Sequence, residues 1–526
     1  MSLRRVRPLF RLCLRPRASR PACLCTPAVD HSLVQRATTR ADYPHKFTVT
    51  TSVAKFVHDY DQLGRDEVDS ATVSIAGRIL RKRPMGKIIF YTIVGNGTAL
   101  QVKCAISDHD EARECSTFKS CHDRLHVGDI IGAVGHPCRT KTGELSVLAS
   151  RVMLLAPCLR HLPAKMAGLK DDVVKLRQPY LSLLATDYRQ KLLIRSRIIQ
   201  WMRQYFHDRD FVEVETPMLM QTPGGALARP FVTHHNNLRR DLFLRISPEL
   251  SLKMLVIGGM ERVFEIGRSF RNESLSAQHL PEFTMCELYE AYADYNDHMT
   301  MTEQLLHGMV HALFGTDEIE FTAPNSVDLV QLSFKPPFRR LSVYDALRDR
   351  LGDVLPTPDQ LHTPESQLTL DRLVTGHDIH CEEPRTAARL FDKLLDRLVE
   401  PNCVQPTFLT DHPQLMSPLA KWHRDAAGLS ERFELFIGGR EIANAYTELN
   451  DPDAQRWMFE QQKLQFSAGD NESLQHDHSF VTALEFGLPP TAGWGLGIDR
   501  LAMVLTQSNN IKDVNWNAWY TKWQTE

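Results

Sequence analysis

The chain has 526 residues, of which 43% are hydrophobic and 24% are charged. Its length corresponds to roughly two or three domains. Its composition is ordinary for a soluble globular protein, which excludes a fibrous or wholly disordered chain. No uncharged apolar run approaches the roughly 20 residues that a membrane-spanning helix needs, so we expect no membrane partner.

The charge is distributed unevenly along the chain. Residues 1–40 contain nine Arg, no Lys and one acid, Asp30, which gives a net charge of +8. Because the whole chain carries −2, the remaining residues carry −10. An Arg-rich, acid-poor start with interleaved apolar residues is typical of a mitochondrial transit peptide. A disordered basic arm that contacts RNA is the alternative. We expect residues 1–40 to be a transit peptide and the protein to act in the mitochondrial matrix.

The 11 Cys contain no CxxC pair. Cys115, Cys121 and His122 lie close together in the sequence, yet no second ligand pair follows at the spacing of a zinc site. We therefore expect reduced thiols and no zinc.

Short strands follow a polar linker and short helix at 41–70. The sequence Gly95-Asn96-Gly97 between two apolar runs is a hairpin signal. Five strands are predicted in all, at 72–76, 88–93, 100–104, 130–134 and 145–147. Five strands within about 90 residues suit a small closed barrel over 71–160, and the OB-fold is the five-stranded barrel that binds oligonucleotides. The periodicity equally allows an SH3-like barrel.

A connector at 161–186 precedes a second domain at 187–526. Apolar residues at helical spacing predict a helix over 189–206. Strands and helices then mix without a regular βαβ repeat, which indicates an α+β domain with an antiparallel sheet and flanking helices. Residues 351–400 are predicted to be a helical insertion. Neither of the common phosphate-loop motifs occurs.

One segment of this domain combines charge with strand-like flanks. Residues 264–273 and 279–289 predict a strand, a charged turn and a second strand, which would aim Arg271 and Glu273 into one cleft. Taken alone, an Arg-Asn-Glu turn is more often a solvated hairpin tip.

Two further segments combine glycines with charge. Residues 433–448 predict an extended strand with one irregularity at Gly438-Gly439, which would bring several acids onto one face. In 493–500, glycines let the backbone approach a ligand, and Arg500 begins a helix. Each has a simpler explanation as a solvent-exposed strand or an ordinary turn, but their joint order favours a functional site.

In that order, these segments resemble the signature motifs of class II aminoacyl-tRNA synthetases. Residues 189–217 resemble motif 1, the Arg271 segment resembles motif 2, and 493–500 resembles motif 3. Within the class, the sequence resembles lysyl-tRNA synthetases over roughly residues 70–514. This match rests on the segments 223–231, 248–253, 291–295, 446–451 and 488–493.

The resemblance implies ATP-dependent activation of L-lysine to lysyl-adenylate and transfer of lysine to the 3′ end of tRNA(Lys), here for mitochondrial translation. It implies catalytic roles for Arg271 at the α-phosphate and Arg500 at the γ-phosphate. Mg²⁺ would be held by Glu434 and Glu441. The implied lysine-binding residues are Gly225, Glu249, Glu287, Tyr289, Asn444, Tyr446 and Glu448. The implied ATP-binding residues are Arg271, Asn272, Glu273, His279, Leu280, Phe283, Glu441, Ile442, Gly497 and Arg500.

These residue types suit the chemistry. Attack of a carboxylate on the α-phosphorus of ATP depends mostly on positioning and on neutralising phosphate charge. The planar guanidinium of arginine can bind phosphate and carboxylate groups through two hydrogen bonds. Carboxylates are suitable ligands for Mg²⁺. The attacking carboxylate is already ionised, so no general base is needed. A lysine pocket must satisfy ammonium groups with fixed acceptors. A pocket for aspartate or asparagine would instead need a cationic or amide partner.

The resemblance also implies that the barrel binds the anticodon and that the protein is a homodimer through motif 1. Phe90 is the favoured stacking candidate, and the alternative is that it is a core residue of a strand. The other anticodon candidates are Arg78, Gln101 and Glu144. The basic side chains expected to face RNA are Arg78, Arg81, Lys82, Arg83 and Lys87.

The sequence departs from the family pattern at two places. Leu280 replaces the usual Asn, and residues 515–523 replace a hydrophobic segment that ends in Phe-Pro. Two other functions are conceivable. One is a catalytically impaired RNA-binding paralogue, which would be expected to lack Arg271, Glu441 or Arg500. The other is an enzyme that lysylates a protein and has little use for the barrel.

Overall fold

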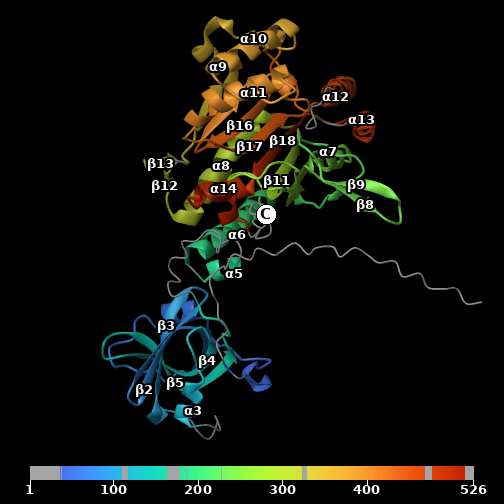
Figure 1. Ribbon diagram of the computed structural model, residues 1–526. Coiled ribbons are helices and arrows are strands. Elements are labelled where there is room, and N and C mark those ends of the chain that lie inside the picture. The colour runs from blue at the N-terminus through green and yellow to red at the C-terminus, as the bar shows by residue number, and fades with distance from the viewer. Residues whose placement is uncertain are drawn as a thin grey trace, which may run out of the picture. The chain divides into compact units, whose positions relative to one another are not determined.

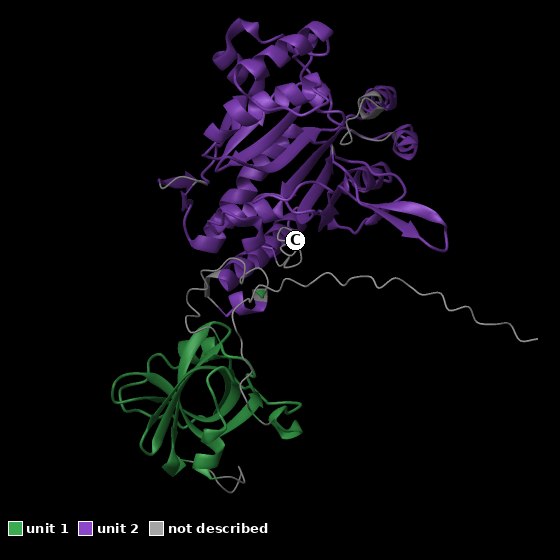
Figure 2. Cartoon of the chain, in the orientation of Figure 1, with its two compact units in different colours: residues 1–178 green, residues 179–526 purple. Residues whose placement is uncertain are grey.

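The computed structural model describes residues 36, 38–108, 117–162, 178–184, 186–226, 228–322, 328–467 and 477–515. The chain forms two compact units, Met1–Gln178 and Pro179–Glu526 (Figure 1, Figure 2). None of the helices in the described ranges has the length and apolarity to cross a membrane. Most of the proposed transit peptide and residues 516–526 of the atypical tail lie outside the described residues.

The first unit contains a closed five-stranded barrel, which confirms the predicted strands. Its strands follow one another around the barrel in the order β1-β2-β3-β5-β4. Their bounds are β1 Val73–Met85, β2 Ile88–Gly95, β3 Thr98–Ala105, β4 Ile130–Arg139 and β5 Leu145–Ala156. Two short helices, α1 (Val53–Asp59) and α3 (Phe118–Asp123), contribute Phe56 and Phe118 to the barrel core.

The predicted hairpin joins β2 to β3. Its two turn residues, Asn96 and Gly97, have φ values of 49° and 81°. A two-residue turn with positive φ at both positions matches the twist of the strands, and Asn-Gly adopts it at low cost. The turn therefore fixes the register in which Phe90 lies opposite Lys103.

The residues before the barrel are attached to it. Arg36 Nη1 lies 2.8 Å from both carboxylate oxygens of Asp129, whose side chain is fully buried. Arg124 forms an ion pair with Asp42 in the same region. Arg36 and 38–40, the described part of the predicted transit peptide, thus belong structurally to the barrel unit.

The second unit is built on an eight-stranded sheet, which confirms the α+β prediction. The strand order is β14-β15-β16-β17-β18-β11-β10-β6, and all neighbours are antiparallel except the pairs β6–β10 and β14–β15. The bounds are β6 Val212–Glu213, β10 Arg262–Phe270, β11 Glu282–Ala291, β14 Arg339–Ser342, β15 Thr407–Thr410, β16 Arg432–Ile437, β17 Arg440–Thr447 and β18 Thr491–Gly497.

Helices flank this sheet (Figure 1). Phe206 of α6 (Thr186–His207) packs against Phe264 of β10 and Trp494 of β18, with ring centres 5.0 and 6.0 Å apart. The remaining helices are α5 Pro179–Ser182, α7 Glu249–Ile257, α8 Tyr295–Phe314, α12 Pro452–Ser467, α13 His478–Leu484 and α14 Ile498–Leu505. The predicted helical insertion over 351–400 contains α10 Pro364–Gly376 and α11 Ala387–Leu398, and α9 Val343–Leu351 directly precedes them.

Two small sheets complete the second unit. One pairs β12 (Glu318–Thr322) with β13 (Leu329–Ser333), and the other has the order β7-β9-β8. The strands of the latter are β7 Leu219–Met220, β8 Val232–His235 and β9 Arg240–Leu244.

The prediction of one extended strand over 433–448 is wrong. Gly438 and Gly439 have φ values of 63° and 69° and form the turn of a hairpin between β16 and β17. An irregularity does lie near the predicted position. The register between β16 and β17 shifts there, so that Ile442 is an extra residue on β17. Side chains alternate along a regular strand, so this bulge allows Glu441 and Asn444 to share one face although they are three positions apart.

Candidate active site

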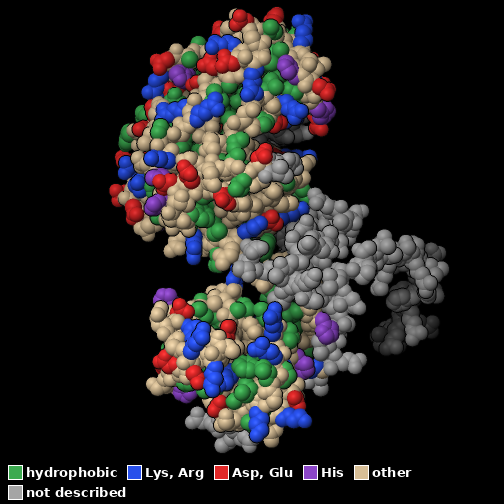
Figure 3. Space-filling model, turned by 90° about the vertical axis from the view of Figure 1, so that its left-hand side faces the viewer, with side chains coloured by type: hydrophobic (Ala, Val, Ile, Leu, Met, Phe, Trp, Pro, Cys, Tyr) green, Lys and Arg blue, Asp and Glu red, His purple; other side chains and the backbone are tan. Residues whose placement is uncertain are grey.

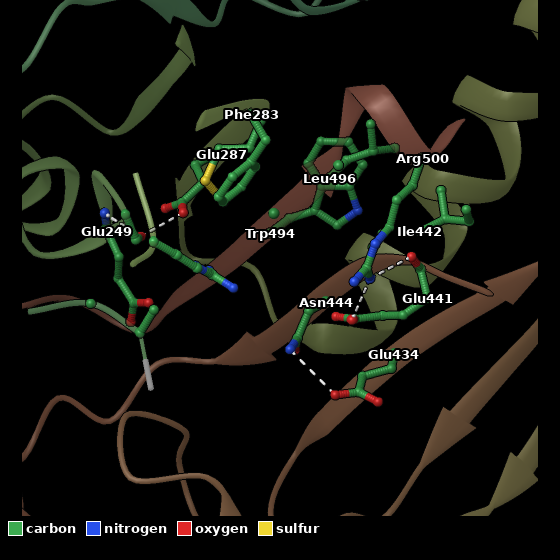
Figure 4. A pocket seen from close by; sticks show the side chains of 18 of the residues that line it. Glu249, Phe283, Glu287, Glu434, Glu441, Ile442, Asn444, Trp494, Leu496 and Arg500 are labelled. Carbon is green, nitrogen blue, oxygen red and sulfur yellow. Dashed lines mark hydrogen bonds and ion pairs between the residues drawn. The ribbon is translucent and has the colours of Figure 1, made fainter. Parts of the chain in front are cut away.

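A cavity of about 580 Å³ lies over β11, β17 and β18. Figure 4 shows Glu249 and Glu287 at one side of it and Glu441 and Arg500 at the other. The predicted site residues that line it are Gly225, Glu249, Arg271, Glu273, His279, Leu280, Phe283, Glu287, Tyr289, Glu434, Glu441, Ile442, Asn444, Tyr446, Gly497 and Arg500. The lining does not include Asn272 or Glu448.

Arg500 joins two predicted ATP-binding residues. Its Nη1 donates to Glu441 Oε2 at 2.8 Å and to the Glu441 carbonyl at 3.0 Å. Its Nη2 lies 2.8 Å from His279 Nε2. Arg500, near the start of α14, thus contacts both the β16–β17 hairpin and the loop between β10 and β11.

His279 is a neutral imidazole in this arrangement. Burial and the charges of Arg500 and Arg271 lower the pKa of His279 to about 4. Because Arg500 donates to Nε2, we assign the ring proton to Nδ1, which lies 2.8 Å from Ser276 Oγ. Ser276 Oγ also accepts the backbone N–H of His279 at 3.0 Å, so it fixes both the ring and its loop.

Arg271 contributes a second cation to the cavity. Its guanidinium carbon lies 5.1 Å from the centre of the Phe283 ring, and its backbone N–H donates to the Pro281 carbonyl at 2.9 Å. Its buried Nε has no hydrogen-bond partner among the described residues. A buried donor without a partner is unfavourable, and an anionic ligand oxygen would satisfy it.

Glu434 and Glu441 are suited to hold a divalent cation. Arg432 donates to Glu434 Oε1 at 2.5 Å, and His412 lies 3.5 Å from Oε2. Burial opposes ionisation of Glu434, but Arg432 and His412 lower its pKa to about 2. Burial, together with the charge of Glu434, raises the pKa of Glu400 to about 9.

No group of three or more His, Cys, Asp or Glu in the described ranges could hold a metal by itself. Mg²⁺ commonly binds one or two carboxylates together with substrate phosphates and water. Glu434 and Glu441, which come from neighbouring strands and both line the cavity, therefore fit Mg²⁺ that arrives with a nucleotide.

Glu287 lies at the other end of the cavity. It accepts hydrogen bonds from Ser247 Oγ at 2.6 Å and from the Tyr289 hydroxyl at 3.1 Å. Burial and the charge of Glu249 raise the pKa of Glu287 to about 8. A carboxyl group with a raised pKa favours a cationic ligand, because a positive charge would stabilise its ionised form.

Glu249 and Glu448 are both paired to a lysine of the chain. Lys253 Nζ lies 2.7 Å from Glu249 Oε1 and forms an ion pair with Glu448. Tyr446 donates to Glu249 Oε1 at 2.6 Å. A Cβ at Gly493 would overlap the Glu448 carboxylate, which explains the glycine there. The role of Glu448 in binding the substrate lysine stays a prediction.

Sequence reasoning missed Ser247, Lys253, Ser276 and Arg432, although each holds a predicted residue in place. The i,i+4 spacing of Glu249 and Lys253 was the available signal for Lys253. The contacts of Ser247, Ser276 and Arg432 depend on the tertiary fold.

The two departures from the family pattern differ in their contacts. Leu280 is buried, lines the cavity and belongs to the same core cluster as Ile511. The Ile511 backbone N–H donates to the Ala277 carbonyl at 2.8 Å, so the chain before the tail supports the β10–β11 loop. In the described part of the tail, Asn515 Nδ2 donates to Asp499 at 3.3 Å.

The predicted anticodon residues lie on the barrel. Phe90 is half-exposed between the buried Ile89 and Tyr91, so it is not a core residue. The strand register places Arg83 and Lys103 opposite Phe90 on the two neighbouring strands. On the barrel face seen in Figure 3, Lys and Arg side chains lie among hydrophobic ones.

The other anticodon candidates differ in their surroundings. Gln101 has a buried side-chain oxygen without a partner in the described part of the chain, whereas Glu144 is exposed. Two members of the predicted basic face are engaged in the fold. Arg78 donates to the Gly128 carbonyl at 2.7 Å, and Lys82 donates to the His122 carbonyl at 2.7 Å.

Comparison with known proteins decides the family. Residues 171–517 match the family described as "tRNA synthetases class II (D, K and N)", and residues 73–155 match "OB-fold nucleic acid binding domain". Lysine--tRNA ligase cla4 of Cladosporium cladosporioides is 48% identical over 90% of this chain and 80% of its own length. The lysine--tRNA ligase of Tolumonas auensis is 42% identical over 86% of this chain and 87% of its own length. The chain belongs to the lysine–tRNA ligase family of class II synthetases.

Membership of this family settles the question that the periodicity left open. The barrel of this lysine–tRNA ligase family member is an OB-fold, not an SH3-like barrel. The α+β unit is the class II synthetase domain, and the match covers the whole cavity described above.

Proposed function

We propose that this protein activates L-lysine with ATP and transfers it to tRNA(Lys). The observation that carries the proposal is the buried Glu287, which faces the cavity with Ser247 and Tyr289 as its donors. A cationic side chain suits this carboxyl group, whereas the side chain of aspartate or asparagine would leave it without a cation. The family and the named relatives support this choice.

The reacting groups would be held from both ends of the cavity. Arg271 would contact the α-phosphate. Its planar fork and its Nε–H, which has no partner within the described ranges, favour the charge that develops in the transition state. Arg500 would exchange its contact with Glu441 for the γ-phosphate, and Phe283 would stack on adenine. Asn444 and Gly225 would orient the lysine carboxylate and α-ammonium for in-line attack.

Mg²⁺ would be held by Glu434 and Glu441. When bound, it would neutralise charge on the ATP phosphates. Arg432 and His412 keep Glu434 ionised for this purpose, and the bulge at Ile442 allows Glu441 to reach the same face as Asn444.

Aminoacylation by the purified full chain tests this proposal. We expect lysine to be attached to a tRNA(Lys) transcript, with no attachment of aspartate or asparagine to their tRNAs. Deletion of residues 71–160 should abolish charging of tRNA, whereas an enzyme that lysylates a protein would keep its activity. Absence of charging by folded wild-type protein would contradict the proposal.

We propose further that the protein acts in the mitochondrial matrix. The +8 charge of residues 1–40 supports import. A fluorescent protein fused to residues 1–40 should enter mitochondria, and replacement of Arg4, Arg5 and Arg7 by Gln should prevent entry. A cytosolic wild-type fusion would overturn this localisation.

We propose a homodimer for the active form. The segment 212–238 exposes several large apolar side chains, which a second copy would cover. They are Val212, Met218, Leu219, Val232 and Leu238, each between 45% and 60% exposed. Light scattering should report twice the chain mass of 60.0 kDa, and a single-chain mass at micromolar concentration would contradict the dimer.

A further inference from the structure

Arg36 is the counter-charge of a buried carboxylate in the barrel unit. Its Nη1 donates to both carboxylate oxygens of Asp129 at 2.8 Å, and its Nη2 donates to the Arg124 carbonyl at 2.5 Å. The Asp129 side chain is 0% exposed, and that of Arg36 is 10% exposed. Within the described ranges, no other Lys or Arg forms an ion pair with Asp129, and the His126 ring lies 4.0 Å away, beyond hydrogen-bond distance. An arginine of the predicted transit peptide therefore neutralises this carboxylate.

Asp129 joins three parts of the barrel. Its carboxylate accepts the backbone N–H groups of His126 at 2.8 Å and of Cys158 at 2.7 Å. Its own carbonyl accepts the backbone N–H of Ile79 at 2.8 Å. The residue thus connects β1, the turn before β4 and the segment that follows β5. Loss of Arg36 would leave a buried charge without a cation at this junction, which is strongly unfavourable.

The chain that follows lies along the barrel as a strap, which we define as Arg36 and residues 38–50. Asp42 forms an ion pair with the Arg124 guanidinium, so Arg124 holds the strap through both its side chain and its carbonyl. The Thr50 backbone N–H donates to a carbonyl of β1 at 2.9 Å. The strap is therefore attached to the barrel at its start, in its middle and at its end.

The positive charge that supports import does not depend on the strap. Residues 1–35 contain seven Arg, no Lys and one acid, Asp30, so they carry +6. Arg36 and Arg40 supply the other two positive charges of residues 1–40. A leader that ends before Arg36 thus keeps the Arg-rich, acid-poor composition that is typical of a transit peptide.

We propose that N-terminal processing ends before Arg36, so that the mature protein keeps this arginine as the counter-charge of Asp129. Cleavage after residue 40, which composition alone suggests, would remove it. Hydrolysis adds one water across a peptide bond, so the leader leaves with a new carboxylate and the mature chain begins with a new ammonium. The inference rests on the proposed import into the matrix and adds to it a boundary of the mature protein.

The first residue of the mature protein tests this boundary. The full-length chain would be imported into isolated mitochondria, recovered after protease treatment of the outside of the organelles, and identified by its intact mass. We expect a shortened chain that begins at or before Arg36. An imported chain that begins after Arg36, or one that is not shortened, would overturn the inference. A chain that stays outside would overturn the proposed localisation, and substitutions in the purified protein would then decide the role of Arg36.

These substitutions are made in the purified full chain. R36Q removes the counter-charge, whereas R40Q removes an equal charge from an exposed neighbour and is the matched control. Hydrogen–deuterium exchange measures the result at the N–H groups of His126 and Cys158, which donate to Asp129. We expect exchange at these groups to be about tenfold or more faster in R36Q than in wild type, and within about twofold of wild type in R40Q.

Two further variants separate the ion pair from packing. In D129N the side chain needs no cation, so R36Q should have little further effect on that background. R36K keeps the charge without the fork, so its exchange should be intermediate. Equal exchange in R36Q and R40Q, or an effect of R36Q that is the same with and without D129N, would overturn the role of Arg36. If R36Q does not fold, R36Q/D129N decides: a folded protein supports the ion pair, and an unfolded one overturns it.

Discussion

Arg500 Nη1 donates a hydrogen bond to Glu441 Oε2 at 2.8 Å, so the proposed γ-phosphate ligand is paired with a proposed metal ligand. The two charges neutralise each other until a nucleotide provides a new partner for each. Binding of ATP with Mg²⁺ would then replace one partly exposed ion pair by two charge-assisted contacts. The pair therefore holds both side chains in the cavity before the substrate arrives.

Replacement of Arg500 by Met should strongly impair use of ATP. We expect kcat/KM for ATP to fall by about a hundredfold or more, because a charged donor to phosphate is lost, while lysine binding stays close to wild type. Exchange kinetics with varied ATP, and calorimetric titration with lysine, measure the two effects. R500K is the matched control, since it keeps the charge without the fork and should be intermediate. An unchanged kcat/KM for ATP in R500M would contradict the role of Arg500.

Lysine binding should release a proton near neutral pH. The pKa of Glu287 is raised to about 8, above the ordinary value of 4.5, so the group is mostly protonated at pH 7. A bound ammonium favours the ionised form, so the affinity for lysine should rise with pH up to about 8 and then level off. Titration calorimetry at pH 7 in phosphate and in Tris should show release of about one proton per lysine.

The same experiment has internal controls. E287Q cannot release this proton, and wild type at pH 8.5 should release a smaller fraction. Observed enthalpies at pH 7 that do not depend on the buffer would show that Glu287 is already ionised or does not meet the ammonium.

Replacement of Phe90 by Ala should weaken recognition of tRNA. Its half-exposed ring lies between Arg83 and Lys103 on the neighbouring strands, and loss of base stacking costs about 1–3 kcal/mol. We expect kcat/KM for tRNA charging to fall by about tenfold or more. I89V, which trims the buried neighbour of Phe90, should leave tRNA charging near wild type. Equal charging by F90A and wild type would remove Phe90 from the anticodon site.

The buried pair of Arg245 and Glu265 should contribute to stability. Arg245 Nη1 lies 2.5 Å from Glu265 Oε1, and both side chains are almost fully buried. Removal of Glu265 leaves a buried charge without its partner, so E265A should lower the free energy of unfolding by about 3–5 kcal/mol. The surface pair of Arg262 and Glu290 provides the control, since R262M should cost less than about 1 kcal/mol. Urea unfolding measures the loss of unfolding free energy in both variants. Equal losses in E265A and R262M would contradict the role of the buried pair.

Most of the fold could be predicted from local patterns. The Asn96-Gly97 turn and the alternation of β2 follow from short-range sequence signals, and the barrel strands were found on that basis. The error at Gly438-Gly439 has a physical cause. Two glycines can form either a bulge or a hairpin turn, and strand pairing at a distance decides between them.

The site could be predicted less completely. Residues with charged or aromatic side chains in family motifs were found, and most of them line the cavity. The pairing of Glu448 with Lys253 could not be predicted, because it joins a helix to the residue that follows β17, 195 positions later in the chain. The engagement of Lys82 by the carbonyls of His122 and Leu125 also depends on closure of the barrel.

The most direct test of the account is ATP–pyrophosphate exchange by the full chain, with each of the 20 amino acids supplied in turn. The buried Glu287 and the two arginines predict exchange with lysine and none with aspartate or asparagine. Exchange with aspartate or asparagine, or no exchange with any amino acid from folded protein, would contradict the assignment of this cavity to lysine activation.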